Sequence, residues 1–139
     1  MLTQYDIIRR LGASIPFDFS NLNPDGEGIL TAAGSWIFVF TVRQVGGSAD
    51  VTTKRSPTAS GITLQVVDGV LHATLTLKTD GTDGTYTASR TWVTPESSEK
   101  TGTDYLWHLW ADDGTGLKYP IQSGSLSLIS SNPEEYATS

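Results

Sequence analysis

The 139-residue chain contains no cysteine, so neither a disulfide framework nor a thiolate metal site is available to it. It also lacks any run of about 18 uninterrupted apolar residues, the length that a membrane-spanning helix requires. Its N-terminal residues do not show the basic and then apolar order of a signal peptide. We therefore expect a soluble protein that is made in the cytoplasm and does not bind membranes.

Basic residues are few and scattered. The chain has 9 lysines and arginines against 15 aspartates and glutamates, which gives a formal net charge of -6. The adjacent basic pairs are Arg9-Arg10 and Lys54-Arg55. A protein that binds a phosphate backbone concentrates its positive charge on one surface. We therefore predict no nucleic-acid partner.

Residue types that support catalysis are also scarce. The two histidines, His72 and His108, do not have H-x-x-x-H spacing. The G-x-S-x-G motif is absent, and a serine nucleophile would have only these two imidazoles as its base. Because no nucleophile is paired with a base, we predict no catalytic residue, no enzymatic activity and no cofactor.

Two glycine-containing turns carry pairs of aspartates, Asp80 with Asp83 and Asp112 with Asp113. Such turns resemble calcium-binding loops. One loop of this kind supplies too few oxygen ligands, and the twelve-residue pattern of a full calcium loop is absent. We therefore expect these aspartates to stabilise their own turns, and we predict no metal site.

Apolar and polar residues alternate along most of the chain, and no helical stripe is present. In residues 36–43 both alternating faces are largely apolar, which favours a central strand covered on both sides. Residues 62–78 predict a hairpin, because Asp68-Gly69 supplies the positive φ that a two-residue turn needs. The pattern predicts an all-β fold, an antiparallel β-sandwich of about seven to nine strands.

The predicted domain is the β-sandwich at residues 13–130, with an N-terminal arm at 1–12 and a flexible C-terminal tail at 131–139. The arm is predicted as a short helix or an extended segment. Its apolar residues stand beside Arg9 and Arg10, a composition that would be poorly placed if left free in water. We therefore expect the arm to dock on another subunit through Tyr5, Ile7 and Ile8.

The four tryptophans are the largest side chains available for a core or a contact. In the strand predicted at residues 105–111, residues on one face differ by two or four positions, so Trp107 and Trp110 point in opposite directions. We expect Trp107 and Trp36 to lie in the core. Trp92 and Trp110 are left to anchor a subunit contact or to stack on a sugar.

Residues 36–129 combine an apolar strand, the sequence DGVLHATLTL and the stretch YLWHLWADDGTGLKYPIQSGSLSL, in that order. This order resembles immunoglobulin-like β-sandwich proteins of tailed bacteriophages and prophages, a group that includes the N-terminal domain of baseplate upper proteins. The segment 78–103 is longer than their pattern requires. The matching residues are Tyr105, Leu106, Trp107, Asp112, Asp113, Gly114, Tyr119, Ser123 and Gly124.

The resemblance implies an immunoglobulin-like sandwich in the virion, with a structural or adaptor role in the tail, baseplate, fibre or head. Such a module assembles through protein–protein contacts with other virion proteins, and we expect it to form a homo-oligomer. The alternative is a carbohydrate-binding module in which Trp92 or Trp110 stacks on a host-surface sugar. The candidate contact residues are Tyr5, Ile7, Ile8, Trp92 and Trp110.

Overall fold

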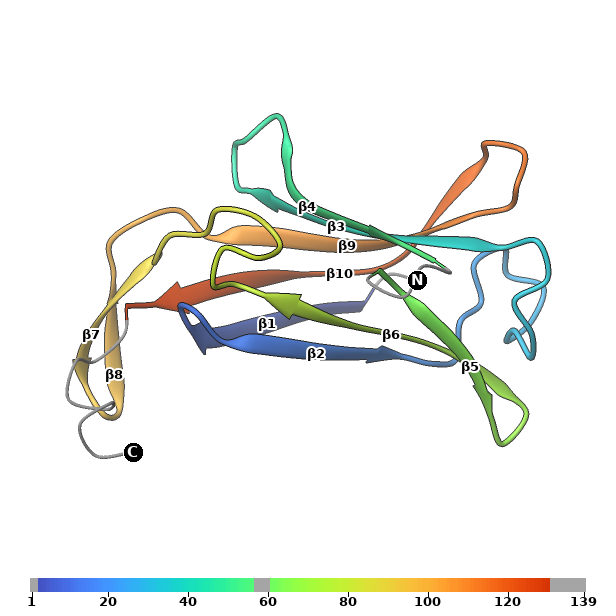
Figure 1. Ribbon diagram of the computed structural model, residues 1–139, viewed down its shortest axis with the longest axis horizontal. Helices are drawn as coiled ribbons and strands as arrows, with labels where there is room; N and C mark the ends of the chain where they lie inside the picture. Colours follow the sequence, from blue (N-terminus) through green and yellow to red (C-terminus); the bar gives the residue numbers. More distant parts are fainter. Residues whose placement is uncertain (1–2, 57–60, 131–139) are drawn as a thin grey trace.

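The computed structural model describes residues 3–56 and 61–130, with side chains from residue 6 onward (Figure 1). The predicted tail at 131–139 lies outside these residues. The described chain contains strands and no helix, so the predicted all-β class is confirmed. The strands are β1 (Thr3–Arg10), β2 (Ser14–Phe19), β3 (Ile37–Gln44), β4 (Asp50–Arg55), β5 (Thr63–Val67), β6 (Val70–Lys78), β7 (Arg90–Thr94), β8 (Ser97–Lys100), β9 (Tyr105–Asp112) and β10 (Lys118–Ile129).

The strands form two sheets that pack in a sandwich-like arrangement (Figure 1). The larger sheet has the order β4-β3-β9-β10-β7-β8, with β1 paired to β10, and the smaller sheet has the order β2-β6-β5. Two details differ from the prediction. The described residues form 10 strands rather than seven to nine, and β10 pairs in parallel with β1 and, at its last residue, with β7.

The additional strands come from segments whose local pattern does not predict strand. β8 has the polar sequence SSEK, and it forms because the tight turn after β7 brings it back against that strand. The other is β1, which belongs to the predicted arm. It pairs with β10 over its whole length, and Ile7 packs against the core. The arm is therefore part of the larger sheet, because β10 offers it a free edge.

The predicted hairpin at residues 62–78 is confirmed. β5 and β6 pair up to Val67 and Val70, and the turn between them is Asp68-Gly69. Both turn residues have positive φ, 52° for Asp68 and 76° for Gly69. A two-residue turn with these angles follows the right-handed twist of the strands that it joins.

The core lies between the two sheets, and Trp107 of β9 is its largest fully buried side chain. The Trp107 ring meets Phe17 of β2 edge-on, with ring centroids 5.3 Å apart, and stacks on Phe40 of β3 at 6.0 Å. Its predicted core position is confirmed. Trp36 is half-buried at the margin, where its ring contacts Tyr119 at 5.7 Å.

Candidate functional site

The structure separates the predicted contact residues into three groups. Ile8 and Trp92 line one surface pocket, and Trp110 lines another on a different part of the larger sheet. Ile7 packs against the core and is a structural residue. The side chain of Tyr5 lies outside the described residues. Its backbone, paired with Gly124, is part of β1.

The first pocket, which we call the end pocket, has a volume of about 240 Å³. Ile129 explains how it forms, because this residue pairs with Arg10 of β1 on one side and with Arg90 of β7 on the other. Two strands that are remote in sequence thereby meet at the end of β10. The pocket is lined by Ile8, Arg10, Trp92, Thr94, Pro95, Glu96, Ser97, Ser98 and Ile129.

The β7–β8 hairpin is held at the end pocket by hydrogen bonds from its base. Fully buried Ser89 accepts backbone N–H bonds from Thr101 and Gly102 at its carbonyl, and its hydroxyl accepts one from Leu128 at 3.0 Å. The backbone N–H of Trp92 donates to the hydroxyl of Ser130 at 3.1 Å. Sequence reasoning missed Ser89, because a single serine in a polar segment gives no periodic signal.

Two side-chain donors of β7 are shielded from solvent without a bonded acceptor. They are Nε1 of Trp92 and Nε of Arg90, and neither has a hydrogen-bond partner in the described part of the chain. The two residues are two apart in one strand and so lie on one face of β7. An unpaired buried donor costs about 1–3 kcal/mol. This end of the larger sheet therefore contains two buried donors that no acceptor of the described residues satisfies.

The second pocket, which we call the sheet-face groove, lies on the outer face of β3 and β9 and has a volume of about 390 Å³. Directly opposed pairs such as Val39–Trp110 and Thr41–His108 form its floor. The rings of Trp110 and His108 stack 5.8 Å apart. Its lining residues are Val39, Thr41, Arg43, Asp50, Leu106, His108, Trp110 and Lys118.

Trp110 is half-buried while Trp107 is fully buried, which confirms the predicted opposite orientation of the two rings. Charges border the groove on two sides. Arg43 and Asp50 form an ion pair at 3.0 Å, and Lys118 is exposed on β10. The groove thus combines an aromatic floor with charged groups of both signs.

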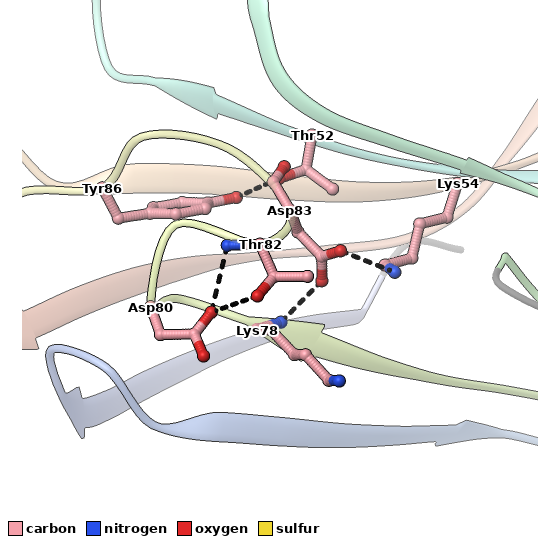
Figure 2. Close-up of polar contacts among 7 residues, drawn as sticks. All are labelled: Thr52, Lys54, Lys78, Asp80, Thr82, Asp83 and Tyr86. Atoms are coloured by element: carbon pink, nitrogen blue, oxygen red, sulfur yellow. Dashed lines mark hydrogen bonds and ion pairs between the residues drawn. The ribbon is translucent and has the colours of Figure 1, made fainter.

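The predicted aspartate turns stabilise the chain locally, as Figure 2 shows for the first of them. Asp83 accepts a hydrogen bond from the Lys78 N–H at 2.7 Å and pairs with Lys54 at 3.2 Å. Asp80 accepts bonds from the hydroxyl and N–H of Thr82, and these bonds hold the pKa of the Asp80 carboxyl below its usual value.

In the second turn, Thr115 bonds to Asp113 in the same way and lowers its pKa. Asp112 accepts bonds from the N–H groups of Gly114 and Gly116. The aspartates therefore bond to their own turns, as the sequence predicts. Within residues 3–56 and 61–130, no group of three or more His, Asp or Glu side chains is placed to hold a metal ion.

The first turn is also fixed against β4. Thr52 donates to the Asp83 carbonyl at 2.7 Å and forms a further bond with the hydroxyl of Tyr86 (Figure 2). Gly84 has a φ of +144°, and a Cβ at this position would lie 2.5 Å from the carbonyl oxygen of Val51. Only glycine permits this approach of the two backbones. The loop is therefore packed directly against β4.

The two histidines lie on different sheets. Nδ1 of His72 is 2.8 Å from Asp18 on the smaller sheet, and His108 lies in the sheet-face groove of the larger one.

No family model, curated protein or solved structure matches this chain. Among the described residues, no helix is long and apolar enough to cross a membrane.

Proposed function

We propose that the chain is an immunoglobulin-like module that acts without catalysis, as a structural or adaptor component of a tailed-phage particle. One observation carries the proposal. The β7–β8 hairpin, added to a sandwich, brings the predicted contact residues Ile8 and Trp92 together in the end pocket. Elements that extend beyond a rigid scaffold are a common location for binding residues.

The strand order supports the immunoglobulin-like part of the proposal. In that fold one sheet contains strands A, B, E and D, and the other contains C, F and G, with C′ added in variable-type domains. The smaller sheet, β2-β6-β5, corresponds to B-E-D, and β4-β3-β9-β10 corresponds to C′-C-F-G. In this assignment β1 is strand A, paired with the last strand, and β7–β8 is an insertion between E and F.

Two core residues support the same assignment. Immunoglobulin domains have a tyrosine near the start of strand F, two residues before a cysteine, and its hydroxyl bonds to an upstream backbone group. Here the Tyr105 hydroxyl accepts a bond from the Thr87 N–H at 3.0 Å, and Trp107 is at the cysteine position. Trp107 contacts Phe17 of β2, so an aromatic pair takes the place of the disulfide between strands B and F.

The end pocket has the chemistry of a protein contact. Ile8 is 46% exposed, which leaves apolar surface available beside the half-buried Trp92 ring. Tryptophan and arginine are the residues most enriched at the energetic centres of interfaces, and a polar rim typically surrounds them. Arg10 lines the pocket, and the hairpin residues Thr94 to Ser98 provide such a rim.

The proposal is tested by looking for the chain in purified particles of the phage or induced prophage that encodes it. We expect it to be detected by mass spectrometry at a fixed ratio to the major tail or capsid proteins. A Trp92→Ala variant should be depleted from particles, and Val66→Ala, an exposed apolar residue of the smaller sheet outside both pockets, is the control. Particles that lack the wild-type chain would contradict the proposal.

Carbohydrate binding is the second candidate, and Trp110 suits it better than Trp92. The Trp110 ring lies in a groove with Thr41, Arg43 and Asp50, which offer both donors and acceptors, whereas Nε1 of Trp92 is shielded from solvent. Titration with host polysaccharide should then change the tryptophan fluorescence of the wild type and not that of Trp110→Phe.

A further inference from the structure

We propose that the sheet-face groove is the contact surface of a symmetric dimer, in which Lys118 of each copy meets Asp50 of the other. This inference rests on the proposed function, because it names one partner of a module that acts through protein contacts. That partner is a second copy of the same chain.

Apolar side chains on the outer face of β3 and β9 provide the centre of the contact. Leu106 is 38% exposed and the Trp110 ring is half-buried, while Val39, opposed to Trp110, is buried beneath them. A sheet face that is bordered only by solvent normally carries polar residues in these positions. Aromatic and aliphatic residues surrounded by charges are instead typical of an interface centre with a polar rim.

The charges of this face are arranged for self-association. Asp50 lies on β4 opposite Arg43, and Lys118 lies on β10 opposite Asp112. Arg43 pairs with Leu106 near the start of β9, whereas Asp112 is the last residue of β9. Asp50 and Lys118 therefore occupy diagonally opposite corners of the face formed by β4, β3, β9 and β10.

A two-fold axis that lies in the interface along the other diagonal exchanges these corners. It brings Lys118 of each copy to Asp50 of its partner, and it keeps Trp110 and His108 near the centre. Such a contact is isologous, which is the commonest symmetry of soluble oligomers. Asp50 can accept the second cation, because both of its contacts with Arg43 use Oδ1.

The shape of the face agrees with this arrangement. Figure 1 shows the turns between β3 and β4 and between β9 and β10 rising from the larger sheet, on the side away from the smaller sheet. These turns stand at the same diagonal corners as Asp50 and Lys118, because one joins β3 to β4 and the other joins β9 to β10. The diagonal two-fold axis makes the strands of the two copies cross.

The test is sedimentation equilibrium over a concentration series, with Asp50→Lys and Lys118→Glu variants. The wild type should form a dimer. Each variant alone places like charges at both ends of the contact, so its dimer should dissociate about tenfold more readily or more. An equimolar mixture of the two variants restores both opposite-charge pairs, and a heterodimer of near wild-type affinity is expected.

Lys78→Glu is the matched control, because Lys78 is an exposed lysine of the smaller sheet and its reversal should leave the dimer unchanged. Circular dichroism of each variant verifies folding. A mixture that stays monomeric, or a dimer that neither variant weakens, would overturn the inference.

A wild-type monomer at all concentrations would also overturn the inference, including one whose Trp110 fluorescence responds to polysaccharide. None of these results contradicts the proposed adaptor role, which depends on the end pocket and is tested by the Trp92→Ala variant in particles.

Discussion

At the scale of single residues, the Thr52–Tyr86 contact is a buried hydrogen bond whose direction follows from its neighbours. The single hydroxyl hydrogen of Thr52 goes to the Asp83 carbonyl, so Tyr86 donates to Thr52. Burial raises the pKa of Tyr86 to about 12 from 10.0. A raised folded-state pKa stabilises the fold below pH 10 and ceases to do so as the pH rises toward 12.

We predict that Tyr86→Phe loses about 1 kcal/mol of unfolding free energy at neutral pH, because Thr52 loses its donor. Between pH 10 and 12 the wild type should lose stability faster than the variant, so the difference between them narrows. Urea unfolding at several pH values measures both effects. Tyr119→Phe, at the sandwich margin, is the control, and equal alkaline slopes for wild type and Tyr86→Phe would contradict the assignment.

Asp104 directly precedes β9, and its carboxylate bonds to β10. Its side chain is 20% exposed. It accepts a bond from Ser127 at 2.7 Å and pairs with Lys100 at 3.2 Å. Burial acts to raise the pKa of Asp104, but the bonds from Ser127 and Lys100 outweigh it and hold the pKa below the usual 3.8. The carboxylate therefore stabilises the fold above that pH, and this contribution is lost as the pH falls below it.

Replacing Asp104 with Asn should cost about 1 kcal/mol at pH 7, because two charge-assisted contacts become neutral or are lost. The deficit should shrink on acidification below pH 3.8, where the wild-type carboxylate becomes protonated. Thermal unfolding across this range measures the change. Glu99→Gln, an exposed carboxylate of β8, provides the comparison, and a deficit independent of pH would show that the charge of Asp104 is not its source.

At the scale of elements, β1 is the segment whose role changes most between sequence and structure. A docking arm is removable, whereas a strand paired along its length with β10 is part of the fold. Ile7 adds buried apolar surface, and the Leu11 N–H donates to the Ile129 carbonyl at 2.8 Å. Loss of β1 would also leave β10 with an unpaired edge, which is a template for strand association.

Removal of residues 1–11 should therefore destabilise the sandwich by roughly 2–4 kcal/mol, from lost hydrogen bonds and the lost burial of Ile7. We also expect concentration-dependent aggregation. Urea unfolding and light scattering measure the two effects. Removal of residues 1–2 alone, which precede β1, is the control, and an unchanged unfolding midpoint in the longer deletion would contradict a structural role for the strand.

For the molecule as a whole, an aromatic cluster lies at the centre of the core between the two sheets. Trp107 contacts Phe17 and Phe19 of the smaller sheet and Phe40 of its own, with centroid distances from 5.3 to 6.0 Å. Buried aromatic residues contribute more area than any other side chains. The chain has no cysteine, so the two layers are joined by packing of this kind and not by a disulfide.

The change Trp107→Ala should therefore cost about 3–5 kcal/mol, since it creates a cavity between the sheets that the aromatic neighbours only partly fill. Trp110→Ala, three residues later on the same strand, should cost less than half as much, because that ring is half-buried on the outer face. Chemical denaturation of both variants, at a concentration where the protein is monomeric, makes the comparison. Similar losses at the two positions would refute the assignment of Trp107 as the central core residue.

Local periodicity and turn chemistry predict three features of the fold from the order of amino acids alone. Alternation predicts the all-β class, Asp68-Gly69 predicts its hairpin, and residue parity predicts the opposite directions of Trp107 and Trp110. These features are readable because side-chain direction in a strand repeats every two residues, and because few residue pairs accept positive φ.

The choice of neighbouring strands, in contrast, is visible only in the folded chain. Three contacts join positions that are far apart in the chain. β1 pairs with β10, β7 pairs with β10 at Ile129, and Ile8 and Trp92 line the same pocket. Local pattern contains no information about partner choice, because any exposed strand edge presents the same backbone donors and acceptors. The pairing is selected by the packing of the whole core, and both proposed contact surfaces depend on that selection.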